Sequence, residues 1–139
     1  NVSSTSIEIS EHIAPLRFHH KKLRPDSGGA GRHRGGLGQD ILIESRSETP
    51  IAVSFLAERT IFPAFGIEGG KDGSPGEVRI NGEKTDPKKQ YVLNKGDTVS
   101  LGTPGGGGHG DPKLRSPAAL AADVAAGYVT VRSAYQGDD

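Results

Sequence analysis

The sequence lacks cysteine, methionine and tryptophan altogether, and aromatic residues make up only 5% of its 139 residues. The absence of cysteine excludes disulfide bonds, thiolate chemistry and cysteine-ligated metal sites, and it fits a reducing compartment. Hydrophobic residues account for 32% of the chain, well below the usual share of a globular domain. A chain with so few large apolar side chains buries only a thin core. We therefore expect it to belong to a larger assembly that covers part of its surface.

An excess of charge of one sign is also missing. Seventeen basic and seventeen acidic residues give a net charge of zero, so we expect neither nucleic acid nor a membrane as a partner. No apolar run reaches the length of a membrane span, and the first residues lack the pattern of a signal peptide. We expect a soluble, cytoplasmic protein. Because the chain does not begin with methionine, we also expect a processed chain or a segment of a longer one.

Glycine and proline are what the sequence has in abundance, with 21 and 9 residues respectively. Most glycines fall in three glycine-rich loops, over residues 25–38, 66–76 and 102–112. Glycine lets two backbones approach closely, and proline favours the polyproline II conformation, which has no internal hydrogen bonds. A flexible linker is the simpler alternative, but charged residues interrupt the first cluster at fixed places. We therefore expect ordered, extended segments that pack side by side.

Strand-like stretches lie between the glycine clusters. They cover residues 13–18, 40–45, 50–60, a hairpin at 76–86 and two strands within 90–103. In the hairpin, Asn81-Gly82 is typical of a type I′ turn, and Asn94–Asp97 supplies a second turn signal. One segment is convincingly helical, about residues 117–126, with Ser116 as N-cap and Gly127 beyond the end. The sequence thus predicts a mainly β fold over the single segment 1–139, with β-sheets, glycine-rich polyproline-II-like segments and one short C-terminal helix.

The run Gly105–Gly110 satisfies the pattern G-x-G-x-x-G of dinucleotide-binding loops. In that motif the last glycine opens a helix whose amides point at a pyrophosphate. Here Asp111-Pro112 follows, and the helix cannot begin before Ser116. The motif also requires an acidic residue at the end of a second strand. The acidic residue at a suitable distance is Asp123, which lies inside the predicted helix. The match is a consequence of four consecutive glycines, and no ATP site is recognisable on this chain.

Three residues are candidates for catalysis: His109, Asp111 and Arg59. The pair His109 and Asp111 could orient a substrate or hold a metal ion, but two ligands do not make a metal site. We expect no metal on this chain, and a purely structural role for His109 stays open. The Arg59 guanidinium could bind a carboxylate or a phosphoryl group.

A second group is expected to bind substrate or to clamp the loops. It comprises Asp26, Arg32, Arg34, Gly105, Gly106, Gly107 and Gly108. Arginine binds anions bidentately, yet arginine and aspartate also satisfy the unpaired carbonyls and amides of glycine-rich loops. We favour the clamping role for Asp26. Both roles remain open for Arg32 and Arg34.

Three long stretches together resemble the C-terminal part of the hydantoinase B/oxoprolinase family. They are LRPDSGGAGRHRGGLGQD (Leu23–Asp40), AERTIFPAFGIEGGKDGSPGEVRING (Ala57–Gly82) and GDTVSLGTPGGGGHGDPKLRSPAALAADVAAGYVT (Gly96–Thr130). They span nearly the whole chain in the family's order. The positions that match one by one are Asp26, Gly28, Gly29, Arg32, Arg34, Gly35, Gly36, Arg59, Gly66, Gly69, Gly70, Gly105–Gly108, Gly110, Asp111 and Pro112. Where this chain has His109, the family often has tyrosine.

The resemblance implies a fold in which β-sheets join a bundle of polyproline-II-like glycine-rich segments. It also implies a C-terminal segment or small subunit of an N-methylhydantoinase B or 5-oxoprolinase type protein. Such proteins open small cyclic amides after phosphorylation of a carbonyl or enol oxygen, with an A-type subunit that binds ATP and Mg²⁺. The family's presumed metal-binding and catalytic residues lie mostly outside the portion that this chain matches.

From this resemblance we expect a hetero-oligomer with a hydantoinase A-like subunit and the rest of the B-type subunit. We expect ATP and Mg²⁺ on the A-type partner, no cofactor on this chain, and no activity from the chain alone. Two alternatives remain open: a subunit of an ATP-dependent ketone carboxylase acting on acetone or acetophenone, and a non-catalytic glycine-rich β-scaffold.

Overall fold

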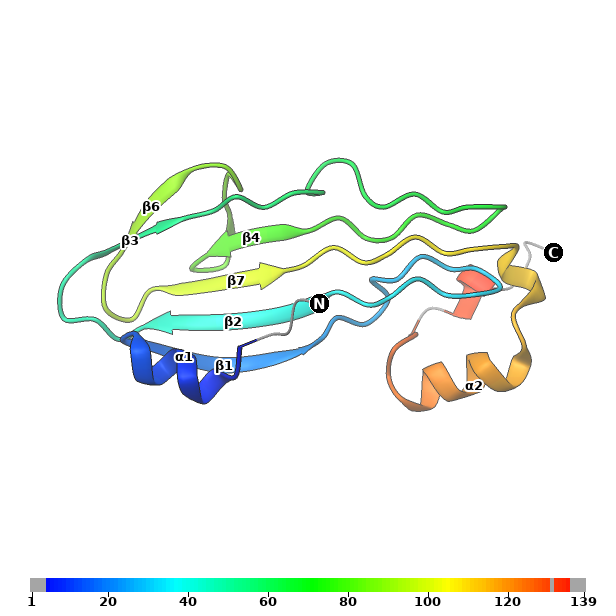
Figure 1. Ribbon diagram of the computed structural model, residues 1–139, viewed down its shortest axis with the longest axis horizontal. Helices are drawn as coiled ribbons and strands as arrows, with labels where there is room; N and C mark the ends of the chain where they lie inside the picture. The colour runs from blue at the N-terminus through cyan, green and yellow to red at the C-terminus, as the bar shows by residue number, and fades with distance from the viewer. Residues whose placement is uncertain (1–4, 131, 136–139) are drawn as a thin grey trace.

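The computed structural model describes residues 5–130 and 132–135. The molecule is elongated: two antiparallel sheets form one end, and glycine-rich segments continue from them to a small helical end (Figure 1). In chain order the elements are α1 (Ile7–Ile13), β1 (Leu16–Leu23), β2 (Gln39–Ser45), β3 (Ile51–Ser54), β4 (Glu77–Ile80), β5 (Glu83–Lys84), β6 (Gln90–Leu93), β7 (Thr98–Gly102), the 3₁₀ turn η1 (Pro112–Leu114), α2 (Pro117–Ala125) and the 3₁₀ turn η2 (Arg132–Tyr135).

The larger sheet has the strand order β1-β2-β7-β4-β5, and the smaller one pairs β3 with β6. In the middle of the larger sheet, Ile43 lies opposite Phe18 on one side and Val99 on the other. The core lies between the two sheets, where Phe55, Val78, Leu93 and Val99 are buried. Only these four side chains form the buried centre of that cluster among the described residues, so the core is as thin as the composition indicates.

The mainly β fold and the C-terminal helix are confirmed. The predicted hairpin is β4–β5, in which Asn81 and Gly82 have φ of 51° and 84°, the left-handed values that a type I′ turn requires. The predicted helix is α2, preceded by Ser116 and followed by Gly127 with φ of 72°. The two strands within 90–103 are β6 and β7, which join different sheets.

Three features differ from the expectation. The predicted strand 13–18 is β1, which begins at Leu16 and continues to Leu23, whereas Ile13 belongs to α1. The stretch 50–60 forms a regular strand only over Ile51–Ser54. Irregular pairing continues through the amides of Phe55 and Ala57, and Arg59 adopts a φ of 54°, which no strand accommodates. The helix α1 was not predicted, since it has no buried residue and therefore no apolar stripe. The sequence feature that marks the start of this helix is its N-cap. The Ser6 hydroxyl accepts a hydrogen bond from the amide of Ile9 at 3.3 Å, as an N-cap does.

Candidate functional site

The glycine-rich segments lie side by side beyond the end of the larger sheet (Figure 1). The run Gly105–Gly108 lies in the middle of them, because its α-carbons closely approach the segments 27–30, 35–36, 65–66 and 70–73. We call these segments, with residues 102–110, the glycine bundle. The three loops that the sequence defines thus form one structure.

The amides of the central run are used within the bundle. Gly105, Gly106 and Gly108 donate backbone hydrogen bonds of 2.9 to 3.0 Å to carbonyl oxygens of the segments 35–38 and 70–76. An amide that already donates to a carbonyl cannot cradle a phosphate. The G-x-G-x-x-G pattern at this place therefore serves packing between backbones.

Successive glycines of the run face different neighbours. A Cβ on Gly105 would lie 1.8 Å from the carbonyl oxygen of Ser27, and one on Gly107 would lie 1.9 Å from that of Phe65. Three residues after Gly105, a Cβ on Gly108 would return to the first neighbouring segment, 2.2 Å from the carbonyl oxygen of Ala30. A period of three residues is that of polyproline II, and no side chain larger than hydrogen fits at these places.

An ion-pair cluster attaches the C-terminal helix to the bundle. Arg34 binds Asp123 of α2 with two hydrogen bonds, from Nε at 3.0 Å and from Nη2 at 3.2 Å. Arg115 donates to the same carboxylate. The three side chains are only 10 to 16% exposed. We call Arg34, Arg115 and Asp123 the clamp.

Both arginines of the clamp also bind the backbone of the turn at 32–35. Arg34 donates to the carbonyl oxygen of Gly35 at 2.7 Å, and Arg115 donates to that of Arg32 at 3.2 Å. The Arg34 hydrogen bond lowers the pKa of Asp123, although burial opposes this, and the charges of both arginines add to the lowering. In this structure the side chain of Arg34 therefore holds a loop and a helix together.

Two aromatic rings complete the surroundings of the clamp. The guanidinium of Arg34 lies 5.7 Å from the ring centre of Tyr128, and that of Arg115 lies 5.8 Å from that of Tyr135, distances typical of cation–π contacts. Tyr135 is buried with Ala30 and Val129, and this burial raises the pKa of its phenol.

Asp26 contacts the part of the chain that follows α2. Its carboxylate accepts hydrogen bonds from the amide of Thr130, at 2.7 Å, and from the Thr130 hydroxyl. Its own amide donates to the carbonyl oxygen of Tyr128. These contacts join the first glycine segment to the chain after α2. Asp26 thus holds two segments together, as a loop-clamping residue does. It also lies beside a hollow of about 300 Å³ that Gly28, Gly29 and Tyr135 help to line.

His109 and Asp111 lie near each other in sequence but have different partners. The ring of His109 is exposed, and its Nε2 lies 3.4 Å from a carboxylate oxygen of Glu68. Its backbone exchanges two hydrogen bonds of 2.9 Å with His33. The Asp111 carboxylate accepts from the amide of Lys113 at 2.9 Å and caps η1. The structure does not bring the two side chains together as a ligand pair.

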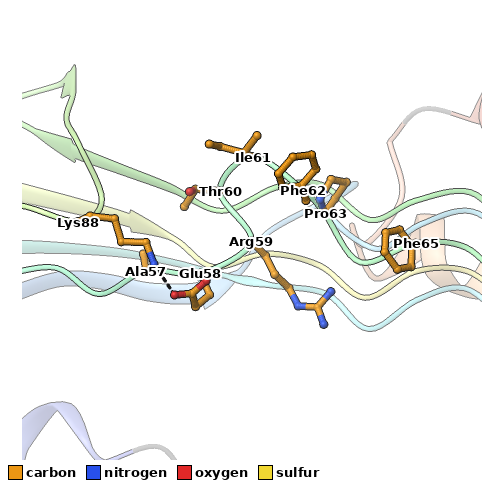
Figure 2. Close-up of a pocket in the computed structure, with 9 residues that line it drawn as sticks. All are labelled: Ala57, Glu58, Arg59, Thr60, Ile61, Phe62, Pro63, Phe65 and Lys88. Carbon is orange, nitrogen blue, oxygen red and sulfur yellow. Dashed lines mark hydrogen bonds and ion pairs between the residues drawn. The ribbon is translucent and has the colours of Figure 1, made fainter.

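Arg59 lies beside a hollow of about 550 Å³, which is formed by residues 57–63, Phe65 and Lys88 (Figure 2). An ion pair between Glu58 and Lys88 lies at one side of it. The guanidinium of Arg59 makes no hydrogen bond or ion pair with any other described residue, and it points away from Ile61 and Phe62 in Figure 2. The exposed side chain of Arg32 lies elsewhere, at the turn of the first glycine loop.

Metal-binding geometry is missing from the part of the chain that the structure describes: no three His, Cys, Asp or Glu side chains there are grouped so as to hold an ion. The neighbouring His19 and His20 pair separately, with Glu44 at 2.8 Å and Asp40 at 3.2 Å.

Sequence reasoning missed Arg115 and Asp123. The signal for Asp123 is its place in the alanine-rich helix, on the same face as Leu120 and Val124, which pack toward the bundle. A carboxylate on a buried face requires a cation, but the sequence does not say which of seventeen basic residues supplies it.

None of the helices within the described ranges is both long enough and apolar enough to span a membrane.

Known proteins are similar in sequence to this chain over most of its length. Residues 1–112 match the hydantoinase B/oxoprolinase family. The chain is 34% identical over 140 residues to the caprolactamase subunit beta of Pseudomonas jessenii, covering 94% of this chain and 24% of that protein. It is 36% identical over 117 residues to 5-oxoprolinase 1 of Arabidopsis thaliana, covering 79% of this chain and 9% of that protein.

Solved structures show the same fold. The crystal structure of an ATP-dependent caprolactamase from Pseudomonas jessenii superimposes with a TM-score of 0.75 at 30% identity, over 94% of this chain and 24% of that one. A nucleotide-free acetone carboxylase superimposes with a TM-score of 0.71 at 21% identity, over 94% of this chain and 22% of that one; that likeness concerns the fold alone. The chain thus spans a quarter or less of the length of these relatives, and it belongs to the hydantoinase B/oxoprolinase family.

Proposed function

We propose that this chain is the C-terminal segment, or a small subunit, of an ATP-dependent cyclic-amide hydrolase of the 5-oxoprolinase/N-methylhydantoinase type. The family match supports this proposal, together with relatives that are named as a caprolactamase subunit and a 5-oxoprolinase. Both names describe the opening of a cyclic amide. The absence of cysteine fits a cytoplasmic place for such an enzyme.

The role of the segment is structural, and the observation that carries this is the glycine bundle. Its central amides and carbonyls bond to one another, and its α-carbons approach so closely that most positions admit no side chain. Such a bundle is a rigid support whose outer side chains can shape a neighbouring site and dock an A-type subunit.

ATP and Mg²⁺ belong to the A-type partner in this proposal. The strongest phosphate-binding pattern on this chain is Gly105–Gly110, and five of its six amides already donate to carbonyl oxygens. Phosphorylation of the amide oxygen of the substrate then takes place at a site that the partner completes. This chain helps to bind and orient the substrate there.

Reconstitution tests the proposal. The chain is assayed alone, with the remaining B-type polypeptide, and with the A-type subunit as well, for ATP hydrolysis coupled to the opening of 5-oxoproline, hydantoins and caprolactam. We expect coupled turnover only when all parts are present.

Two results would contradict this function. Coupled lactam hydrolysis by the isolated chain would show that it holds a complete active site. ATP turnover in the full assembly that requires bicarbonate and acetone or acetophenone would identify a ketone carboxylase instead.

A further inference from the structure

Large apolar side chains gather on one exposed segment, at the edge of the glycine bundle. Leu56, Ile61, Phe62, Phe65 and Ile67 are 84, 78, 77, 74 and 62% exposed. We call these five side chains the 56–67 ridge. Half of the exposed large hydrophobic residues that the structure describes belong to it. Soluble chains seldom expose apolar groups so densely except where they bind a partner.

The backbone of the ridge is fixed although its side chains are free. The carbonyl oxygens of Arg59, Ala64 and Ile67 each accept a hydrogen bond of 2.9 Å from a glycine amide, that of Gly76, Gly73 and Gly110 respectively. The amide of Ile67 donates to the carbonyl oxygen of Gly108, also at 2.9 Å. The side chains therefore project from a held support, and binding needs little ordering of the loop.

Strained backbone lies near both ends of the same segment. Arg59 and Glu68 have φ of 54° and 51°, a conformation that non-glycine residues seldom adopt outside functional or tightly determined places. These two residues bound the part of the chain that carries Ile61, Phe62 and Phe65.

The ridge carries one cation beside the apolar groups. Arg59 borders the hollow of about 550 Å³ (Figure 2), and within the described ranges its guanidinium has no acceptor. Because this guanidinium points away from Ile61 and Phe62 (Figure 2), a surface that fits the ridge offers an apolar depression to the five side chains, and an acceptor for the guanidinium lies on another side.

We propose that the 56–67 ridge docks onto the region of the hydantoinase B-type polypeptide that lies outside the part matched here. The caprolactamase subunit beta extends far beyond this segment, which covers only 24% of it. A region joined to the segment at fixed stoichiometry is the partner most suited to a permanent, strongly apolar contact. This inference rests on membership of the family and not on the reaction proposed above.

A second copy of the chain is a poorer fit. In a two-fold symmetric dimer through the ridge, each projecting ridge would face an identical projecting ridge and not the apolar depression that fits it.

Photo-crosslinking in the complete protein, with its A-type partner present, tests the proposal. Phe62 is replaced by the photoreactive residue p-benzoylphenylalanine (Phe62→p-benzoylphenylalanine), the sample is irradiated, and the linked peptides are mapped by mass spectrometry. We expect the free Phe62 peptide to be lost and to reappear joined to peptides of the remaining B-type region. The matched control is Val92→p-benzoylphenylalanine, which is 63% exposed on β6 and outside the ridge; its free peptide should persist.

Other crosslinks would overturn the proposal. Linkage to the A-type subunit, linkage to a second copy, or no loss of the free peptide in intact protein each rules out the assigned partner. If the variant at Phe62 does not accumulate, Phe65→p-benzoylphenylalanine repeats the experiment on the same ridge. The readout is independent of turnover, so a ridge that docks as expected in an assembly without lactam hydrolysis would contradict the proposed function alone.

Discussion

At the scale of single residues, two adjacent glycines of the bundle have opposite surroundings. A Cβ on Gly35 would lie 2.0 Å from the carbonyl oxygen of Gly106, whereas a Cβ on Gly36 would meet nothing within 4 Å. We expect Gly35→Ala to lower the free energy of unfolding by about 2 kcal/mol or more, as overpacking does. Gly36→Ala should change it by about 0.5 kcal/mol or less, because it only restricts the unfolded chain.

Urea unfolding of both variants beside the parent measures the difference. The two substitutions are chemically identical and lie in the same segment, so composition and helix or strand propensity cancel. Equal stabilities would show that the backbones are not in the close contact described here.

At the scale of elements, the clamp decides how α2 is attached. Asp123→Asn keeps the size of the side chain but leaves Arg34 and Arg115 without their shared carboxylate. Because breaking a mostly buried ion pair leaves charges uncompensated, we expect a loss of about 3 kcal/mol in the free energy of unfolding. Loss of α2 signal in circular dichroism before the sheets unfold would locate the effect.

The ion pairs of Asp123 also make the free energy of unfolding depend on pH. The pKa of Asp123 is lower in the folded chain than the ordinary value of about 3.9, so the folded state binds this proton less readily than the unfolded state. The stabilisation is complete above about pH 4 and is lost as the pH falls through the lowered value. Unfolding measured between neutral and acid pH should show this loss.

The acid dependence has a matched control. Asp123→Asn should flatten the acid limb of the stability curve, whereas Glu83→Gln, an exposed carboxylate on β5, should leave it unchanged. An unaltered limb in the Asp123 variant would assign the dependence to other carboxylates.

At the scale of the whole molecule, order extends beyond the helices and strands. The bundle has no regular strand over residues 103–108, yet Gly105, Gly106 and Gly108 all donate backbone hydrogen bonds there. We expect their amides to exchange with deuterium as slowly as those of β7, since exchange requires opening of the packed segments. Exchange as fast as in a flexible linker would contradict the bundle.

The two apolar clusters explain why the molecule relies on such packing. One lies between the sheets around Phe55 and Val99, and the other lies at the C-terminal helix around Val129 and Tyr135. The bundle connects them by contacts between backbones. Large apolar surface is left exposed on the 56–67 ridge, which agrees with a segment that completes its core against another part of an assembly.

Local signals were sufficient for much of the fold. The Asn81-Gly82 turn, the limits of α2 and the strands around β7 follow from residue types at fixed spacing, because glycine, asparagine and proline act on their own backbone. The left-handed backbone of Arg59, with a φ of 54°, was not predictable in the same way, because no local sequence pattern indicates it.

The sequence by itself determined that this protein has a thin core, no disulfides and three ordered glycine-rich segments, since these depend on composition and on the freedom of single residues. Only the tertiary structure decided that Arg34 and Arg115 share the carboxylate of Asp123 and that the side chains of His109 and Asp111 have different partners. It also decided that the side chains of the 56–67 ridge are exposed. The reason is physical: each of these facts depends on which distant segments meet, and a glycine fits against many neighbours until close packing selects one.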